Sequence, residues 1–162
     1  MTDDSVYLDF SGNELIRCSR ADGAGIQLVH YANSLGLTNI RMMILSSETN
    51  PVAHRRAQKL DVECHTGIER KFEFLIKFAS DDLKVSSEEF LSNLVYFGND
   101  LNDLKIMKSA FLSVAPYNSH PMVKKEADLV LDEYGGAGFV RAAIEYLLGS
   151  SLVSEIVRKK YD

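Results

Sequence analysis

The segment LVYFGNDLND, residues 94–103, constrains the fold of this chain more than any other. A short apolar run ends in a glycine, and amide and carboxylate side chains then open a helical pattern. In an open α/β sheet this arrangement marks the carboxyl end of a strand, where ligands bind. Oxygen ligands there suit a hard cation such as Mg²⁺, which usually serves phosphate chemistry. The segment therefore predicts an α/β fold with a polar site at a strand end.

Length and composition narrow the class of protein. A chain of 162 residues predicts one domain, residues 1–162, with a core that needs no disulfide or structural metal. The net charge of −5 argues against nucleic-acid and membrane partners. Cys18 and Cys64 lie far apart with no CxxC motif, which favours reduced thiols. With no apolar run near the roughly 20 residues of a membrane span and a polar beginning, we expect a soluble, cytoplasmic protein.

Strand and helix patterns alternate along the chain. Residues 6–10 and 14–18 flank a turn composition and predict a β-hairpin, followed by a helix that Asp22 caps and Gly36 ends. Further strands are expected at residues 40–45, 62–64, 94–97, 110–114 and 127–131. Further helices are expected at residues 51–60, 69–79, 86–89, 100–108, 139–148 and 152–160. This alternation predicts a parallel, doubly wound sheet. Within the domain, residues 6–18 form a flap, residues 22–148 an α/β core and residues 150–162 a terminal helix.

Seven motifs in order resemble the haloacid dehalogenase superfamily. The chain is most similar to the cap-less branch, the sugar-acid 8- or 9-phosphate phosphatases, and within that branch it most resembles the phosphatase-like C-terminal domain of acylneuraminate cytidylyltransferases. It implies a Rossmann-like three-layer α/β sandwich with a parallel sheet and no cap domain. The motifs are RADGAGI (20–26), ILS with Pro51 (44–51), RRAQKL (55–60), GIERK (67–71), GNDLND (98–103), SVAP with His120-Pro121 (113–121) and GGAGFVR (135–141).

The resemblance also implies roles for individual residues. Ser46 would bind a phosphoryl oxygen and Lys71 would neutralise charge on the phosphate and the nucleophile. Asn99, Asp100 and Asp103 would complete a Mg²⁺ site. The implied substrate contacts are Arg141, Asp22, Ser47 and His120.

Each implied role has a simpler structural alternative. Taken singly, Ser46 is a strand-end turn serine and Lys71 a solvated helix lysine. Asp100 can cap the following helix, with Asp103 adding first-turn charge. The glycines at 135–138 either position Arg141 or form a purely structural turn. The order and spacing of the motifs favour the functional interpretation for Ser46 and Lys71.

The beginning of the chain departs from the family pattern. Relatives begin with a strand and an Asp-x-Asp-Gly loop that carries the nucleophile, whereas Met1-Thr2-Asp3-Asp4 resembles the segment after that loop. We therefore expect the first strand and both catalytic aspartates to lie upstream of Met1. Asn99 stands where phosphatase relatives usually place a metal-binding aspartate. The segment YLDFSG around Asp9 mimics the nucleophile motif, but its composition and its spacing from Asp22 favour a hairpin turn.

Three functions remain as hypotheses. The first is a Mg²⁺-dependent phosphatase of a 2-keto-3-deoxy sugar acid phosphate, a nonulosonate 9-phosphate or octulosonate 8-phosphate, which needs a nucleophile from outside this sequence. The second is a non-catalytic oligomerisation or ligand-binding domain associated with an acylneuraminate cytidylyltransferase as domain or partner. The third, a Mg²⁺-dependent response module, shares Ser46, Lys71 and Asp100, but the hairpin and the GGxGxxxR ending argue against it. The resemblance implies a homotetramer whose hairpin covers a neighbouring subunit's site.

Overall fold

The computed structural model describes residues 5–161, and the prediction made for Met1-Thr2-Asp3-Asp4 lies outside them. These residues form two compact units. The first combines residues 5–42 with residues 131–161, and the second is residues 43–130. The prediction of a single domain stays a prediction. In the part of the chain that the structure describes, no helix is long and apolar enough to cross a membrane.

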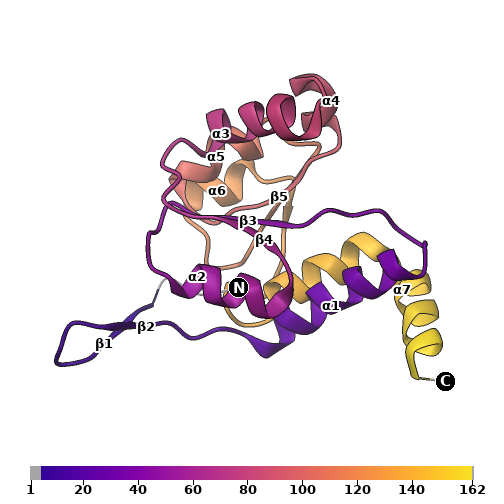
Figure 1. Ribbon diagram of the computed structural model, residues 1–162, viewed down its shortest axis with the longest axis horizontal. Coiled ribbons are helices and arrows are strands. Elements are labelled where there is room, and N and C mark those ends of the chain that lie inside the picture. Colours follow the sequence, from indigo (N-terminus) through magenta and orange to yellow (C-terminus); the bar gives the residue numbers. More distant parts are fainter. Residues whose placement is uncertain (1–4, 162) are drawn as a thin grey trace. The chain divides into compact units, whose positions relative to one another are not determined.

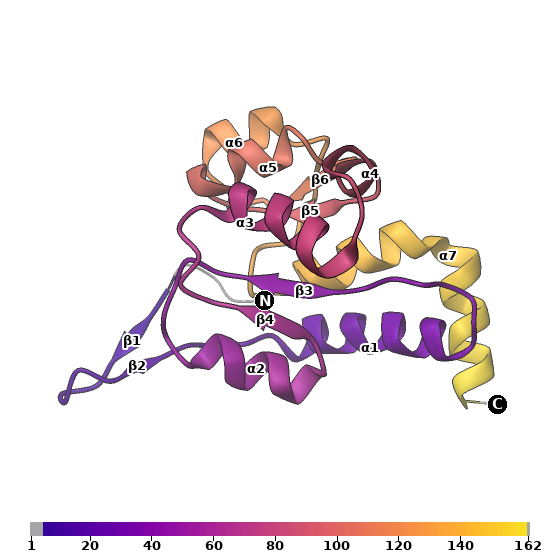
Figure 2. The same cartoon turned by 45° about the horizontal axis from the view of Figure 1, so that its top comes forward.

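The first unit contains a β-hairpin and two helices that lie side by side (Figures 1 and 2). Strands β1 (Tyr7–Leu8) and β2 (Glu14–Leu15) pair antiparallel and confirm the predicted hairpin, although they are shorter than expected. Helix α1 (Arg20–Ser34) packs against α7 (Phe139–Tyr161). Both helices carry buried apolar side chains: Ile26, Val29, Ala32, Phe139, Ala143, Ile144 and Ile156.

The beginning of α1 differs from the prediction. Ser19, not Asp22, is the N-cap, and its hydroxyl accepts the backbone N–H of Asp22 at 3.2 Å. Asp22 lies inside the first turn and is fully buried. The predicted C-terminal stop is confirmed, because Gly36 adopts a positive φ of 68° and its N–H donates to the carbonyl of Asn33. Asp22 therefore does not cap α1, contrary to the prediction from its sequence position.

Helix α7 joins the two helices that were predicted at 139–148 and 152–160. Gly149, with φ 74° and ψ 152°, is non-helical and kinks the helix between them. The segment after the kink is tied to α1, since the Tyr31 hydroxyl donates to the carbonyl of Lys159 at 2.9 Å. The boundary between the two predicted helices is therefore a bend and not a loop.

The second unit alternates strands and helices. Its strands are β3 (Met43–Leu45), β4 (Glu63–His65), β5 (Val95–Phe97), β6 (Leu112–Ala115) and β7 (Leu129–Val130). Its α-helices are α2 (Val52–Leu60), α3 (Lys71–Phe78), α4 (Ser87–Ser92), α5 (Leu104–Met107) and α6 (Pro121–Glu126). A π-helix (Ala79–Leu83) extends α3, and a 3₁₀ turn (Leu101–Asp103) leads into α5. The π-helix and α6 were not predicted, since both are too short to show a hydrophobic period.

The strands of this unit confirm a parallel α/β architecture. Strand β3 pairs with β4, with Ile44 opposite Cys64, while β5, β6 and β7 form a second parallel sheet with Tyr96 opposite Ser113. Helices α2 and α3 lie on opposite sides of β3–β4 (Figures 1 and 2). Among residues 5–161 no strand joins β3 to β5, so one continuous sheet would need a further strand between them.

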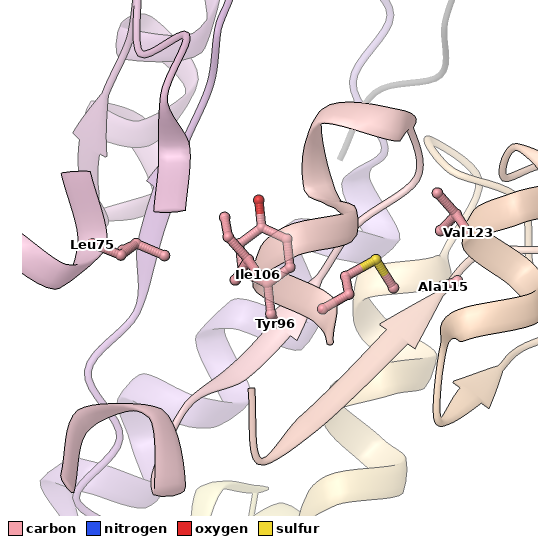
Figure 3. Close-up of a cluster of buried hydrophobic side chains, with 6 residues drawn as sticks. Leu75, Tyr96, Ile106, Ala115 and Val123 are labelled. Carbon is pink, nitrogen blue, oxygen red and sulfur yellow. The ribbon is translucent and has the colours of Figure 1, made fainter. Parts of the chain in front are cut away.

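One apolar cluster holds the second unit together (Figure 3). It contains Leu75, Tyr96, Ile106, Met107, Ala115 and Val123. Met43 and Leu45 of β3 pack against the same cluster, which therefore receives side chains from both sheets. Strands β3 and β5 both pack in this core. The core therefore holds the backbone at the start of the polar loop that follows each strand.

Candidate functional site

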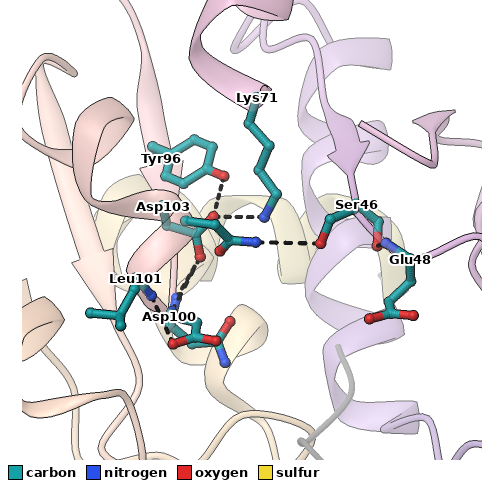
Figure 4. Close-up of polar contacts among 10 residues, drawn as sticks. Ser46, Glu48, Lys71, Tyr96, Asp100, Leu101 and Asp103 are labelled. Atoms are coloured by element: carbon teal, nitrogen blue, oxygen red, sulfur yellow. Dashed lines mark hydrogen bonds and ion pairs between the residues drawn. The ribbon is translucent and has the colours of Figure 1, made fainter. Parts of the chain in front are cut away.

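A buried ion pair lies beyond the carboxyl end of β5 (Figure 4). Lys71, the first residue of α3, places Nζ 2.7 Å from Asp103 Oδ1. The side chains are only 9% and 4% exposed. An ammonium group with so little access to water is favourable only beside a carboxylate. The structure thus excludes the alternative that Lys71 is a solvated helix lysine.

The other oxygen of Asp103 shapes the loop between β5 and α5. Oδ2 accepts the backbone N–H groups of Asn99 at 3.0 Å and Asp100 at 3.3 Å. Asp100 closes a capping box with Asp103 and also accepts the N–H of Leu101 at 2.7 Å. Gly98 permits this fold-back, because a Cβ there would lie 2.7 Å from Asp103 Cβ. Asp103 therefore fixes both Lys71 and the backbone that presents Asn99 and Asp100.

Tyr96 is a member of this network that sequence reasoning did not single out. Its hydroxyl donates to Asp103 Oδ1 at 2.7 Å, the same oxygen that Lys71 contacts. Burial, and then the charge of Asp103 and the hydrogen bond to it, raise the pKa of Tyr96 far above its ordinary value. The available signal was a tyrosine in an apolar strand two residues before the glycine, since a buried phenol needs an acceptor.

Two serines follow β3 at its carboxyl end. The Ser46 hydroxyl accepts the N–H of Glu48 at 3.1 Å, as expected of a serine in a turn, and the Ser46 N–H donates to the carbonyl of His65. Ser47 Oγ accepts a hydrogen bond from Asn102 Nδ2 at 3.3 Å. This bond joins the loop after β3 to the loop after β5. The structure thus brings Ser46 and Ser47 to the same end of the unit as Asn99–Asp103 (Figure 4).

His120 is placed near this end of the unit by its backbone. Its N–H donates to the carbonyl of Asn99 at 2.9 Å. The ring Nδ1 accepts the N–H of Met122 at 3.2 Å, so His120 is the N-cap of α6. The side chain is exposed. His120 thus lies at the start of a helix, where a loop was expected.

Comparison with known proteins decides the family. Residues 76–142 match the family of haloacid dehalogenase-like hydrolases. The 3-deoxy-D-manno-octulosonate 8-phosphate phosphatase of Salmonella typhi is 30% identical over 151 residues, which cover 91% of this chain and 73% of that protein. The chain belongs to the haloacid dehalogenase-like hydrolases. Within them it falls in the branch of the octulosonate 8-phosphate phosphatases, as its motifs predicted.

Two other known proteins are similar to this chain, one in structure and one in sequence. The 3-deoxy-D-manno-octulosonate 8-phosphate phosphatase of Moraxella catarrhalis superposes with a TM-score of 0.82 at 23% identity, over 98% of this chain and 86% of that one. That crystal structure contains a magnesium ion, a phosphate ion and a KDO molecule. N-acylneuraminate cytidylyltransferase B of Danio rerio is 24% identical over 91% of this chain but 33% of its own length. The fold is thus shared with the Moraxella catarrhalis phosphatase, and the sequence similarity extends to about a third of the cytidylyltransferase.

The loop after β5 could supply two oxygen ligands to a hard cation. Asn99 and Asp100 offer an amide oxygen and a carboxylate at the strand end. The Asp103 carboxylate already receives four donors, two on each oxygen. In the described ranges no group of three or more His, Cys, Asp or Glu residues could hold a metal. Mg²⁺ commonly takes one or two protein oxygens with waters and substrate phosphate, and this donor set meets that requirement.

Two of the predicted substrate contacts, Asp22 and Arg141, lie in the first unit. Asp22 is buried in α1 and Arg141 lies in the first turn of α7, where it is exposed. Asp22 Oδ1 accepts the N–H groups of Val140 and Arg141 at 3.0 and 3.3 Å. These two predicted residues are thus in direct contact with each other.

The segment that resembles the dehalogenase nucleophile motif is a turn. Asp9 Oδ1 accepts the N–H groups of Ser11 and Asn13, and Oδ2 accepts Asn13 Nδ2 at 2.8 Å. These bonds, the side-chain bond from Asn13 first, hold the pKa of Asp9 below its ordinary value. The hairpin-turn interpretation of Asp9 is confirmed.

Proposed function

We propose that this chain acts on the phosphate ester of a 2-keto-3-deoxy sugar acid as a phosphatase-type domain. An octulosonate 8-phosphate or a nonulosonate 9-phosphate is the expected substrate. The observation that supports this most is the buried Lys71–Asp103 pair beside the Ser46 and Ser47 loop. Membership of the octulosonate-phosphatase branch supports the substrate class. The protein is further proposed to act in the cytoplasm, where phosphorylated sugars are held.

In this proposal Ser46 donates a hydrogen bond to a phosphoryl oxygen, while the Lys71 ammonium neutralises phosphate charge. Asp103 is paired with Lys71 before phosphate binds and keeps the ammonium group oriented, so no reorganisation is needed. Ser47 and His120 lie at the same end of the unit and are proposed to contact the substrate. In this proposal the contribution of Ser46 and Lys71 is electrostatic stabilisation of a loose phosphoryl-transfer transition state.

Mg²⁺ is proposed as the cofactor, held by Asn99 and Asp100, with Asp103 holding their loop in place. When bound, the ion would supply charge stabilisation for the phosphoryl oxygens. Asp103 was predicted to be a ligand itself. Its four donors favour an indirect role, because a ligand position on Asp103 would displace a hydrogen bond already made.

The test is phosphate release from the 8-phosphate and the 9-phosphate, with Mg²⁺ and with a chelator. With the nucleophile that this hypothesis requires from outside the sequence, we expect chelator-sensitive turnover that Lys71→Ala abolishes and Asp9→Asn leaves intact, since Asp9 is a turn residue. Lys77→Ala, an exchange of another α3 lysine, is the matched control. Loss of turnover in Asp9→Asn would overturn this account of the N-terminal hairpin.

The alternative is a binding or assembly domain associated with an acylneuraminate cytidylyltransferase. The position of Asp9 favours it, because the segment that mimics the nucleophile motif is a hairpin turn in which the Asp9 carboxylate is engaged by Ser11 and Asn13. Several apolar side chains of the hairpin are more than half exposed: Val6, Tyr7, Leu8, Phe10 and Leu15. Such a surface supports self-association, and a homotetramer is proposed. A folded protein that binds the sugar acid and releases no phosphate would establish this alternative.

A further inference from the structure

Arg141 has one side of its guanidinium engaged and the other available. Its Nε donates to Glu145 Oε1 at 2.8 Å, one turn along α7. No described residue makes a hydrogen bond to either terminal nitrogen, and the side chain is 49% exposed. Glu145 thereby restrains a planar fork whose two remaining nitrogens can receive a carboxylate in a bidentate manner.

The residue before α7 has no side chain that could cap the helix. Gly138 directly precedes α7 and has a φ of +108°, a conformation that side-chain-bearing residues rarely adopt. The usual Ser, Thr, Asp or Asn cap is therefore unavailable at this position. The first N–H groups of the helix need an acceptor from elsewhere.

Asp22 supplies that acceptor from the neighbouring helix. Its Oδ1 receives the N–H groups of Val140 and Arg141, the second and third residues of α7, although 118 and 119 residues separate them in sequence. Asp22 is 0% exposed. The carboxylate thus performs across two helices what an N-cap side chain performs within one.

Gly25 fixes the same point by close packing. A Cβ on Gly25 would lie 2.7 Å from Arg141 Cα and 3.1 Å from its Cβ. Asp22 and Gly25 are three residues apart and share one face of α1. Helices α1 and α7 lie side by side (Figure 2). One face of α1 therefore sets the backbone position of Arg141 through one hydrogen-bonding residue, Asp22, and one close steric contact, Gly25.

We propose that Asp22 and Gly25 are positioning residues for Arg141, and that Arg141 binds the carboxylate of the sugar acid. This rests on the proposed substrate class but not on turnover. The planar fork matches a planar carboxylate. The predicted role of Asp22 as a direct substrate contact is replaced, since its carboxylate is buried and engaged.

The test is calorimetric binding of the free 3-deoxy-octulosonate, which carries the carboxylate and no phosphate. Arg141→Ala should weaken binding at least about tenfold, the loss of a charge-assisted hydrogen-bond pair. Asp22→Ala and Gly25→Ala should each weaken it by about fivefold or more, because a displaced fork no longer aligns. Asp22→Asn keeps the Oδ1 acceptor and should remain within about threefold of wild type.

A double-mutant cycle separates positioning from general stability. In Asp22→Ala/Arg141→Ala, binding should be no weaker than in Arg141→Ala alone, within about twofold. Ser86→Ala, which removes the N-cap of α4 in the other unit, controls for loss of a cap and should bind normally. Additive losses, or wild-type affinity in both Asp22→Ala and Gly25→Ala, would overturn the proposal, as would a wild-type protein that does not bind the acid. Binding without phosphate release would instead refute the phosphatase and leave this assignment standing.

Discussion

Lys71 and Asp103 are 32 residues apart in sequence and form a buried ion pair of 2.7 Å. The pair explains why two residues that each suit a helix surface lie inside the second unit. Removing one partner leaves the other charge buried without compensation. We expect Asp103→Ala to lower the free energy of unfolding by about 3–5 kcal/mol, measured by urea denaturation.

A matched control for this prediction is the exposed pair of Lys105 and Glu73 on the neighbouring helices. Glu73→Ala should leave the urea midpoint unchanged, because water screens the pair. Equal losses in the two variants would show that the Lys71–Asp103 pair is no more buried in solution than a surface pair.

Tyr96→Phe should destabilise the protein by about 1–2 kcal/mol at pH 7, since it removes a hydrogen bond to a charged acceptor. The raised pKa of Tyr96 means that the folded state keeps its phenolic proton at a pH where the unfolded chain has lost it. That contribution is complete below the ordinary value of 10.0 and falls as the pH rises above it. The stability gap between wild type and variant should therefore narrow above pH 10. A constant gap would contradict the buried position of the hydroxyl.

Ser113→Ala tests the join between β6 and the turn before β7. The Ser113 hydroxyl donates to Asp128 Oδ2 at 2.6 Å and is the main reason that the pKa of Asp128 lies below its ordinary value. A lowered carboxyl pKa stabilises the fold above 3.8 and stops doing so as the pH falls through the folded value. The loss at pH 7 should be on the order of 1 kcal/mol, reduced by the exposure of Asp128.

The pH profile of that difference is the decisive measurement. The gap between wild type and Ser113→Ala should shrink in acid, below about pH 4. Ser92→Ala, which removes a hydroxyl that donates only to a helix carbonyl, should show no such pH dependence.

Asn99→Asp should strengthen Mg²⁺ binding by about tenfold, because an added carboxylate raises the charge of the proposed ligand set. Titration calorimetry with Mg²⁺ alone measures this without any substrate. Asn102→Asp adds the same charge to the same loop at the residue that contacts Ser47, and should change the affinity less. Equal effects would mean that charge in the loop, not ligation by residue 99, controls the ion.

Replacing Phe10 by serine should lower the mass observed by analytical ultracentrifugation, because the exposed hairpin is proposed to mediate self-association. Phe10 is fully exposed in the turn that follows β1. Phe111→Ser removes another exposed phenylalanine, 70% exposed and in the second unit, and should leave the mass unchanged. An unchanged mass in Phe10→Ser would exclude the hairpin as the contact.

Sequence patterns located most of the elements because their strand ends, turns and helix stops are marked by residues close in sequence. The apolar run before Gly98, the turn around Gly12 and the stop at Gly36 depend on neighbours within a few residues. Errors arose where two local signals compete. Asp22 and Ser19 both suit a helix start, and only the backbone conformation shows that Ser19 is the cap. Helix α6 was too short for its period to be recognised.

The sequence by itself determined the family, the parallel α/β class and the candidates Ser46, Lys71 and Asp100, because motif order and strand-end position are properties of the chain. Only the tertiary structure decided what the carboxylates do. Asp103 faces Lys71 and Tyr96, and Asp22 caps a helix that begins 117 residues later at Phe139. Such pairings depend on which helix faces pack together, and packing across that much chain leaves no local pattern from which to derive them.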